Sequence, residues 1–211
     1  MSRRSLMAFA VGAAVGLAAC GKKQSRARDV PRGATVLALG DSITFGTGAG
    51  PETSYPAVLA RLSGWNVVNA GVPGDTSAQA LQRLPALLQE HTPALVLVSI
   101  GGNDFLRRLP EADTRSNVRS ICRQAVAANA QVLLIAVPRA TLLAAAAGSL
   151  TDHVLFAELA DELKLPLQRQ GWAQVLSDAR LRSDTVHANA HGYERFAHSV
   201  FDTAKAVGLL R

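Results

Sequence analysis

Residues 36–44 read Val-Leu-Ala-Leu-Gly-Asp-Ser-Ile-Thr, and the interpretation of the whole chain starts from this stretch. An apolar run that favours a β-strand ends at Gly40, and Ser42 follows almost at once. Ligands of open α/β sheets bind beyond the carboxyl ends of the strands, which is where this order places the hydroxyl of Ser42. Gly-Asp-Ser is also an ordinary turn composition, so the stretch alone is compatible with a loop or a helix cap.

Three further segments follow in chain order, and together with the first one they favour a functional site over an ordinary turn. They read Asn-Ala-Gly-Val-Pro-Gly-Asp-Thr-Ser at 69–77, Gly-Gly-Asn-Asp at 101–104 and Asp-Thr-Val-His-Ala-Asn at 184–189. With the first segment they resemble the SGNH hydrolases, also called the GDSL family, from about residue 36 to residue 196. The run from 74 to 104, which includes Arg-Leu-Pro-Ala-Leu-Leu at 83–88, resembles in particular a branch of bacterial periplasmic thioesterases, lysophospholipases and arylesterases.

Hydrophobic patterning predicts an α/β domain. Residues 95–98 and 132–135 are apolar at every position, which is typical of strands buried on both faces of a parallel sheet. The predicted strands are 35–39, 65–69, 95–100, 132–137 and a weaker 166–169, and the predicted helices are 54–62, 76–89, 115–129, 152–163 and 190–207. The resemblance implies the three-layer α/β/α, flavodoxin-like fold with a mostly parallel five-stranded sheet.

The segments contain the groups that ester hydrolysis requires. A serine hydroxyl needs an adjacent base, which makes Ser42 the candidate nucleophile and His187 the candidate base, since imidazole exchanges a proton near neutral pH. Asp184 lies three residues before His187, so one turn can hold its carboxylate against the ring. In the family that the chain resembles, this Asp-x-x-His spacing is the acid–base pair of the triad.

Hydrolysis through a tetrahedral intermediate also needs donors for the oxyanion. The resemblance implies three of them: the backbone N–H of Ser42, the backbone N–H of Gly74 and the side-chain amide of Asn103. Two glycines before Asn103 would let the chain turn sharply at the end of a strand. Gly71 is the alternative to Gly74, because the second segment contains both glycines.

Neighbouring polar residues have simpler explanations. We expect Asp75 and Thr76 to cap the helix that follows them, and Asp41 and Asp104 to brace their loops by hydrogen bonds. Asp184, His187 and His191 could together hold a metal ion, but His191 fits better on the first turn of the last helix. The sequence therefore predicts neither a metal nor another cofactor.

The positive charge is concentrated at the N-terminus. The chain has 211 residues, 48% of them hydrophobic, which suits one globular domain, and its formal net charge is +6. Residues 1–35 hold seven basic residues and one acid, so the remainder is neutral overall. A nucleic-acid partner is not expected, because phosphate binding requires a basic face on the folded domain.

The first residues are typical of an export signal. Arg3 and Arg4 precede an uncharged run over 5–19, which is shorter than the ~20 apolar residues of a membrane span. The run ends in Leu-Ala-Ala-Cys-Gly at 17–21, which resembles a bacterial lipobox and implies cleavage before Cys20 and acylation of that cysteine. The alternatives are a simple signal peptide with a chance cysteine, or, for the route of export, a twin-arginine signal.

This reading divides the chain into three parts. Residues 1–19 are the expected signal peptide, 20–34 a lipidated flexible tether and 35–211 the hydrolase domain. The expected location is the bacterial cell envelope, with the protein anchored in the outer membrane facing the periplasm, or periplasmic if it has no anchor. Cys122 lies at helical spacing among Val118, Ile121 and Ala125, so it is expected to be a buried apolar residue rather than a reactive thiol.

The predicted activity is hydrolysis of acyl esters or thioesters through an acyl-serine intermediate. The resemblance implies aryl esters, acyl thioesters and lysophospholipids as substrates, with a carbohydrate or cell-wall deacetylase as the enzymatic alternative. A non-catalytic lipoprotein that binds acyl chains is the alternative of another class. Residues 138–151, which include an alanine-rich patch at 142–148, are interpreted either as a short helix or as a loop that shapes the substrate groove. The sequence leaves the oligomeric state open.

Overall fold

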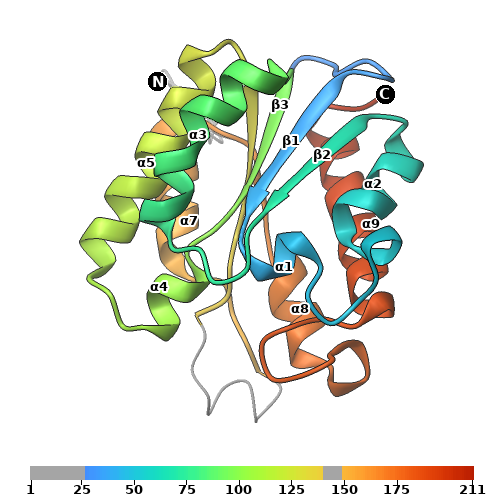
Figure 1. Ribbon diagram of the computed structural model, residues 1–211, viewed down its shortest axis with the longest axis vertical. Helices are drawn as coiled ribbons and strands as arrows, with labels where there is room; N and C mark the ends of the chain where they lie inside the picture. Colours follow the sequence, from blue (N-terminus) through green and yellow to red (C-terminus); the bar gives the residue numbers. More distant parts are fainter. Residues whose placement is uncertain (1–26, 140–148) are drawn as a thin grey trace, which may run out of the picture.

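The computed structural model describes residues 27–139 and 149–211, and its framework is a five-stranded sheet (Figure 1). The strand order is β2-β1-β3-β4-β5, and every pairing between neighbouring strands is parallel. The strands are β1 (Thr35–Gly40), β2 (Asn66–Gly71), β3 (Leu95–Ser99), β4 (Gln131–Ile135) and β5 (Leu167–Gln168). The predicted fold class is confirmed.

Burial of the strands explains their composition. All five residues of β3 are buried, and so are the last four of β4, as expected for strands covered on both faces. The edge strand β2 is more exposed, and it begins at Asn66 rather than at Trp65. Trp65 instead lies in the core, where its indole N–H donates to the carbonyl oxygen of Val30 at 2.9 Å.

Helices cover the two faces of the sheet (Figure 1). One layer contains α3 (Ser77–His91), α5 (Glu111–Ala127) and α7 (Val154–Leu163), and the other contains α2 (Tyr55–Ser63), α8 (Gly171–Ser177) and α9 (Ala190–Val207). The side chains between sheet and helices form two separate apolar clusters, one on each face. On the face covered by α2, α8 and α9, four buried aromatic side chains pack against one another: Tyr55, Trp172, Tyr193 and Phe196.

Several short elements have no counterpart in the sequence prediction. They are α1 (Ser42–Phe45), α4 (Gly102–Leu106) and α8, together with the 3₁₀ turns η1 (Pro51–Thr53) and η2 (Ala179–Leu181). Helices of four to seven residues are too short to develop an apolar period. The long helix α5 begins at Glu111, four residues before the predicted start, because Pro110 occupies its N-cap.

The folded part of the chain begins earlier than residue 35. The backbone N–H of Ala27 donates to Val207, that of Val30 donates to Leu209, and the side chain of Val30 is 1% exposed. Residues 27–34, which we expected to belong to the flexible tether, therefore pack against the C-terminal end of the domain. Buried Val30 is the physical reason, because its apolar side chain closes the core beneath Trp65.

Several sequence predictions concern segments outside the described residues. They are the signal peptide, Cys20, the first part of the tether and the alanine-rich patch at 142–148. Among the residues that the structure describes, no helix is long and apolar enough to cross a membrane.

Candidate active site

The candidate site lies where β1 and β3 end, at the point where the strand order changes direction. Ser42 is the first residue of α1, directly after β1, and Asn103 lies in α4, directly after β3. The register pairs Gly40 of β1 with Ser99 of β3, so both strands end at the same level. A crevice at such a switch point is the general ligand site of open α/β sheets.

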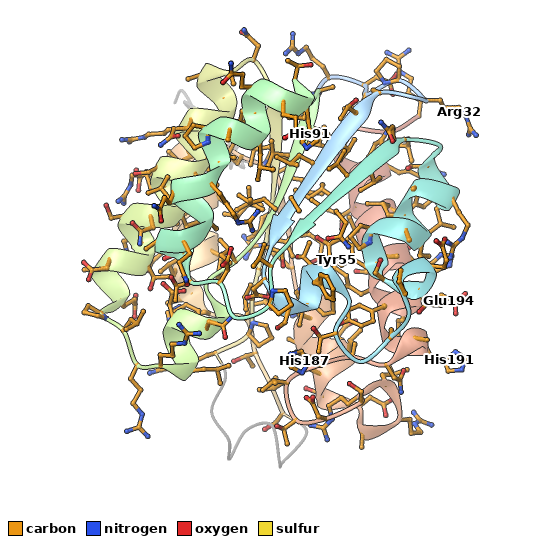
Figure 2. All side chains as sticks on the ribbon, viewed as in Figure 1. Arg32, Tyr55, His91, His187, His191 and Glu194 are labelled. Atoms are coloured by element: carbon orange, nitrogen blue, oxygen red, sulfur yellow. The ribbon has the colours of Figure 1, made fainter. Side chains whose placement is uncertain are left out.

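Ser42, His187 and Asp184 form a continuous hydrogen-bonded series. His187 Nε2 lies 2.9 Å from Ser42 Oγ, and His187 Nδ1 lies 2.7 Å from Asp184 Oδ2. An ionised carboxylate only accepts hydrogen bonds, so Nδ1 carries the proton and the lone pair of Nε2 faces the serine hydroxyl. The neutral ring is therefore oriented to accept the proton of Ser42. Figure 2 shows His187 below the carboxyl ends of the strands.

A tight turn holds the carboxylate of Asp184 in place. Its Oδ1 accepts the backbone N–H groups of Val186 and His187, both at 2.8 Å, while Oδ2 faces the imidazole. Partial burial alone would raise the pKa of this carboxyl, but the hydrogen bonds from the His187 ring and from the two backbone N–H groups outweigh burial and hold the pKa below its ordinary value. The carboxylate of Asp184 is thus ionised over the pH range in which the imidazole of His187 needs a negatively charged partner.

Gly74 occupies a tight turn beside Ser42. The N–H of Asp75 donates to the carbonyl of Val72 at 3.1 Å, and Gly74 has φ +85°. Proline at the second position and positive φ at the third are the signature of a type II turn, which only glycine adopts without strain. The N–H of Gly74 takes no part in the bond that closes the turn. It is therefore available to a ligand in the crevice that Ser42 and Gly74 both line.

Gly71, the alternative to Gly74, is committed to packing. Its N–H donates to the side-chain oxygen of Asn69 at 3.0 Å. A Cβ at this position would lie 2.1 Å from the backbone nitrogen of Phe45, so the glycine permits close approach of α1. Of the two glycines, only Gly74 lines the crevice.

The amide of Asn103 reaches the same crevice from α4. Gly101, with φ +113°, supplies the sharp turn between β3 and this helix. Asn103 Nδ2 donates to the carbonyl of Asp75 at 3.0 Å, whereas its contact with Asp41 Oδ2 is 3.5 Å and weak. The second N–H of the amide is therefore available to an oxygen bound near Ser42. The structure brings together all five residues that the sequence analysis named for the triad and the oxyanion.

The crevice has a volume of about 330 Å³ and a mainly apolar wall. Besides the residues already described, apolar side chains from several elements line it: Ile43, Pro73, Leu106, Val137, Pro138, Leu150, Leu176 and Val186. Segment boundaries and periodicity do not reveal these positions, because the residues come from loops and from the short helices α1, α4 and α8, which meet only in the fold. The mainly apolar wall suits an acyl chain, and its polar side chains include those of Thr47 and Thr185 besides those of the residues described above.

Two buried aspartates beside the site, Asp104 and Asp41, form the hydrogen bonds that we expected of them. Asp104 accepts the N–H and hydroxyl of Ser77 and the hydroxyl of Thr114, and it braces α4 against the start of α3 as expected. Asp41 accepts the N–H of Ile43 at 3.1 Å and so caps α1. These two expectations are confirmed.

Asp75 does not cap α3, which corrects one expectation. Its carboxylate pairs with Arg83 Nε at 2.7 Å, and Arg83 also donates to the carbonyl of Gly40 at 2.9 Å. Thr76 alone caps the helix, in a capping box with Gln79. Arg83 thereby links the turn before α3 to the end of β1, a contact that the spacing of the sequence does not indicate.

The carboxyl of Asp41 is 2% exposed, and burial raises its pKa to about 7, with further upward contributions from Asp104 and Asp75. The folded protein therefore holds this proton between about pH 4 and pH 7, whereas the unfolded chain releases it. Stability should fall as the pH rises through this window, by up to about 4 kcal/mol for a shift of this size.

We therefore expect Asp41→Asn to flatten the pH dependence of unfolding. The amide keeps an oxygen that can accept the N–H of Ile43, but it carries no charge. Urea unfolding at pH 5 and pH 8 should show wild type losing stability between the two values and the variant losing much less. Equal pH dependence in both proteins would show that Asp41 is ionised throughout.

The metal alternative finds no support in the geometry. The side chain of His191 is 84% exposed on the first turn of α9, with Nδ1 3.9 Å from Glu194 Oε2. Figure 2 shows His191 on the outer side of the helix, away from His187. Within 27–139 and 149–211, no group of three or more histidine, cysteine or acidic side chains is arranged to hold a metal ion.

Cys122 is buried in α5, as expected. Burial raises the pKa of its thiol to about 12, so the thiol is neutral at physiological pH. It is 1% exposed and belongs to the apolar cluster between sheet and helices. Cys122 therefore contributes to packing.

Comparison with known proteins agrees with this geometry. The model of the GDSL-like Lipase/Acylhydrolase family matches residues 38–195. The chain belongs to this family. The match includes the end of β1, Ser42, both glycine-containing segments and the Asp184–His187 turn.

Named relatives of this GDSL hydrolase are esterases and thioesterases. It is 37% identical over 161 residues to thioesterase 1/protease 1/lysophospholipase L1 of Escherichia coli K12, covering 74% of this chain and 76% of that protein. It is 44% identical over 108 residues to the esterase TesA of Pseudomonas aeruginosa, covering 49% and 54%. A crystal structure of TesA superposes with a TM-score of 0.72 at 31% identity, covering 82% of this chain and 99% of the other. The protein is an ester hydrolase with esterase or thioesterase function.

Proposed function

We propose that this GDSL hydrolase cleaves medium-chain acyl esters and thioesters, with Ser42 as nucleophile and His187 as base. The observation that supports it is the hydrogen-bonded series from Ser42 Oγ through His187 to Asp184, at 2.9 and 2.7 Å, at the mouth of an apolar crevice. A protein that only binds acyl chains would have no use for a base aligned on a hydroxyl.

The first half of the reaction is acylation. Ser42 Oγ attacks the carbonyl carbon of the substrate while its proton passes to His187 Nε2, and the C=O bond becomes a C–O⁻ single bond. The backbone N–H groups of Ser42 and Gly74 and the amide of Asn103 donate to this oxyanion. Asp184 stabilises the imidazolium that forms.

The second half releases the two products. The tetrahedral intermediate collapses, the bond to the alcohol or thiol breaks, and His187 returns its proton to the leaving group. Water then attacks the acyl-serine with His187 again as base, and the carboxylic acid leaves while Ser42 regains its proton. The carboxylate of Asp184 stays ionised throughout, in agreement with its lowered pKa.

The apolar wall supports acyl chains longer than acetyl as substrates. Leu106, Val137 and Leu176 help to make the wall mainly apolar. Apart from Asp41 and the triad and oxyanion residues, the polar side chains among the described lining residues are those of Thr47 and Thr185. A deacetylase would bury little of this wall. The names of the relatives, which include thioesterase, lysophospholipase and esterase, are consistent with acyl substrates of this kind.

The test is an acyl-length profile on p-nitrophenyl esters, repeated with acyl thioesters. We expect kcat/KM to rise from acetyl to medium chains, because each added methylene that enters the crevice contributes up to about 0.8 kcal/mol of binding. A preference for acetyl, with no gain from a longer chain, would overturn the proposed acyl class while leaving the hydrolase activity intact.

We further propose that the protein is exported and anchored through lipid on Cys20, in the outer membrane and facing the periplasm. The support is in the sequence: two arginines, an uncharged run over 5–19 and the lipobox-like segment at 17–21. Ala27 already bonds to Val207 of the domain, so the sequence between Cys20 and this contact is short. Several acyl chains would hold such a domain stably at a membrane.

Cys20→Ser should release the protein from the membrane fraction or leave it unprocessed, because serine at this position cannot be acylated through sulfur. Cys122→Ser is the matched control and should not change location, since the thiol is buried in α5. Fractionation and mass spectrometry of the mature N-terminus distinguish the outcomes. A mature chain that starts downstream of residue 20, or a Cys20→Ser protein that is cleaved yet membrane-bound, would refute the anchor.

A further inference from the structure

Arg107 connects the two elements that supply the candidate oxyanion donors. It follows α4 as its C-cap, and its backbone N–H donates to the carbonyl of Asn103 at 3.0 Å. Its guanidinium Nη2 donates to the carbonyl of Gly74 at 2.8 Å. One residue thus contacts the backbone of both Asn103 and Gly74.

The two contacts of α4 to the glycine turn are consecutive along the chain. Asn103 Nδ2 donates to the carbonyl of Asp75, and Arg107 donates to the carbonyl of Gly74, the residue before it. Residues four apart lie on the same face of a helix, so Asn103 and Arg107 hold the turn from one side. The carbonyls of both residues after Pro73 are thereby fixed to α4.

This anchor matters because it acts on the backbone of Gly74 itself. The residues on either side have other contacts, from the Val72 N–H to the carbonyl of Gly40 and from Asp75 to Arg83. One backbone bond closes it, from Asp75 to Val72, and Gly74 itself has φ +85°. The nearest atom to a Cβ built on Gly74 is Nη2 of Arg107, at 3.6 Å, so the arginine is the neighbour that limits movement on this side. Rotation of the Gly74 backbone would turn its N–H away from the oxyanion.

We propose that Arg107 is a positioning residue for the oxyanion hole, which fixes the Gly74 turn against α4. This inference rests on the proposed role of Ser42. The benefit of such donors depends on their being held before the reaction begins, so a loosened turn loses part of their effect. Substrate binding in the ground state does not require the same alignment.

Arg108 provides a matched control. It is the next residue, it is exposed, and its side chain makes no hydrogen bond or ion pair among the described residues. Its φ of +57° is unaffected by a change from arginine to glutamine, because both carry a Cβ. Arg107→Gln and Arg108→Gln therefore remove the same charge from adjacent positions, and only the first removes the contact to Gly74.

The test measures kcat and KM on a p-nitrophenyl acyl ester for Arg107→Gln, Arg107→Lys and Arg108→Gln. Loss of one complete donor costs ~10²–10³ in kcat, so a donor that is loosened rather than lost should cost about 10- to 30-fold. We expect that loss for Arg107→Gln with KM changed less than about twofold, partial recovery in Arg107→Lys, and Arg108→Gln within about twofold of wild type.

A boronic acid inhibitor supplies a readout that a purely structural role would not move. Its adduct with a serine carries a tetrahedral oxygen in place of the oxyanion, so its inhibition constant should weaken by the same factor as kcat/KM in Arg107→Gln. Equal kcat in the two glutamine variants, or a rise in KM at unchanged kcat, would overturn the inference. Inactive wild-type protein, or full activity in Ser42→Ala, would instead refute the proposed function.

Discussion

Replacing Ser42 by alanine should reduce hydrolysis by ~10⁶ in kcat, the loss seen when the nucleophile of a serine triad is removed. The reason is the alignment of its hydroxyl on His187 Nε2 at 2.9 Å, which no neighbouring hydroxyl reproduces among the described residues. Hydrolysis of a p-nitrophenyl acyl ester measures the effect. The fold should be retained, because Ser42 is the first residue of α1 and the cap of that helix comes from Asp41.

Chemical labelling adds an independent check of the same assignment. A fluorophosphonate should modify Ser42 in the wild-type protein and should leave the alanine variant unlabelled. Ser77 is the control and should stay unlabelled in both proteins, since its hydroxyl is buried and bonded to Asp104. A variant that keeps a tenth of wild-type activity, or a label on another residue, would show that Ser42 is not the nucleophile.

The part of the site that the sequence could predict is the part that depends on local geometry. Asp184 and His187 are three residues apart, so one turn brings carboxylate and ring together whatever the rest of the fold does. Ser42 follows a strand whose apolar run is easily recognised, and parallel strands place their carboxyl ends at one edge. The fully buried strands β3 and β4 made the sheet predictable in the same way.

Contacts between distant segments could not be predicted. The ion pair of Asp75 with Arg83 and the bond from Arg107 to Gly74 depend on how α3, α4 and the glycine turn meet. A sequence pattern does not show that either pair of residues comes into contact. Asp75 was expected to be a cap because it precedes a helix, but Thr76 occupies that position and leaves the carboxylate for the arginine.

The N-terminal boundary was misplaced for a similar reason. Residues 22–33 have a polar, basic composition without apolar periodicity, which favours a spacer. A single buried side chain, Val30, and backbone bonds to Val207 and Leu209 are enough to attach this segment to the domain. Composition averages over a segment, whereas docking depends on one or two residues of it.

The second large effect is expected at His187. Its replacement by alanine should reduce kcat nearly as much as loss of Ser42, because in a comparable triad removal of either residue costs ~10⁶. Without the ring, no described side chain is in place to accept the serine proton, and the carboxylate of Asp184 loses its partner at 2.7 Å. Added imidazole should restore part of the activity if it enters the space that the ring leaves.

His191→Ala is the control, since the two histidines lie four residues apart and differ in surroundings. The side chain of His191 is 84% exposed and that of His187 is 19% exposed. Activity of His191→Ala should therefore stay within about twofold of wild type, as expected of a surface change that contacts no reacting group. Comparable losses in the two alanine variants, together with inactivation by a chelator and recovery with zinc, would replace the serine triad by a metal site built from Asp184, His187 and His191.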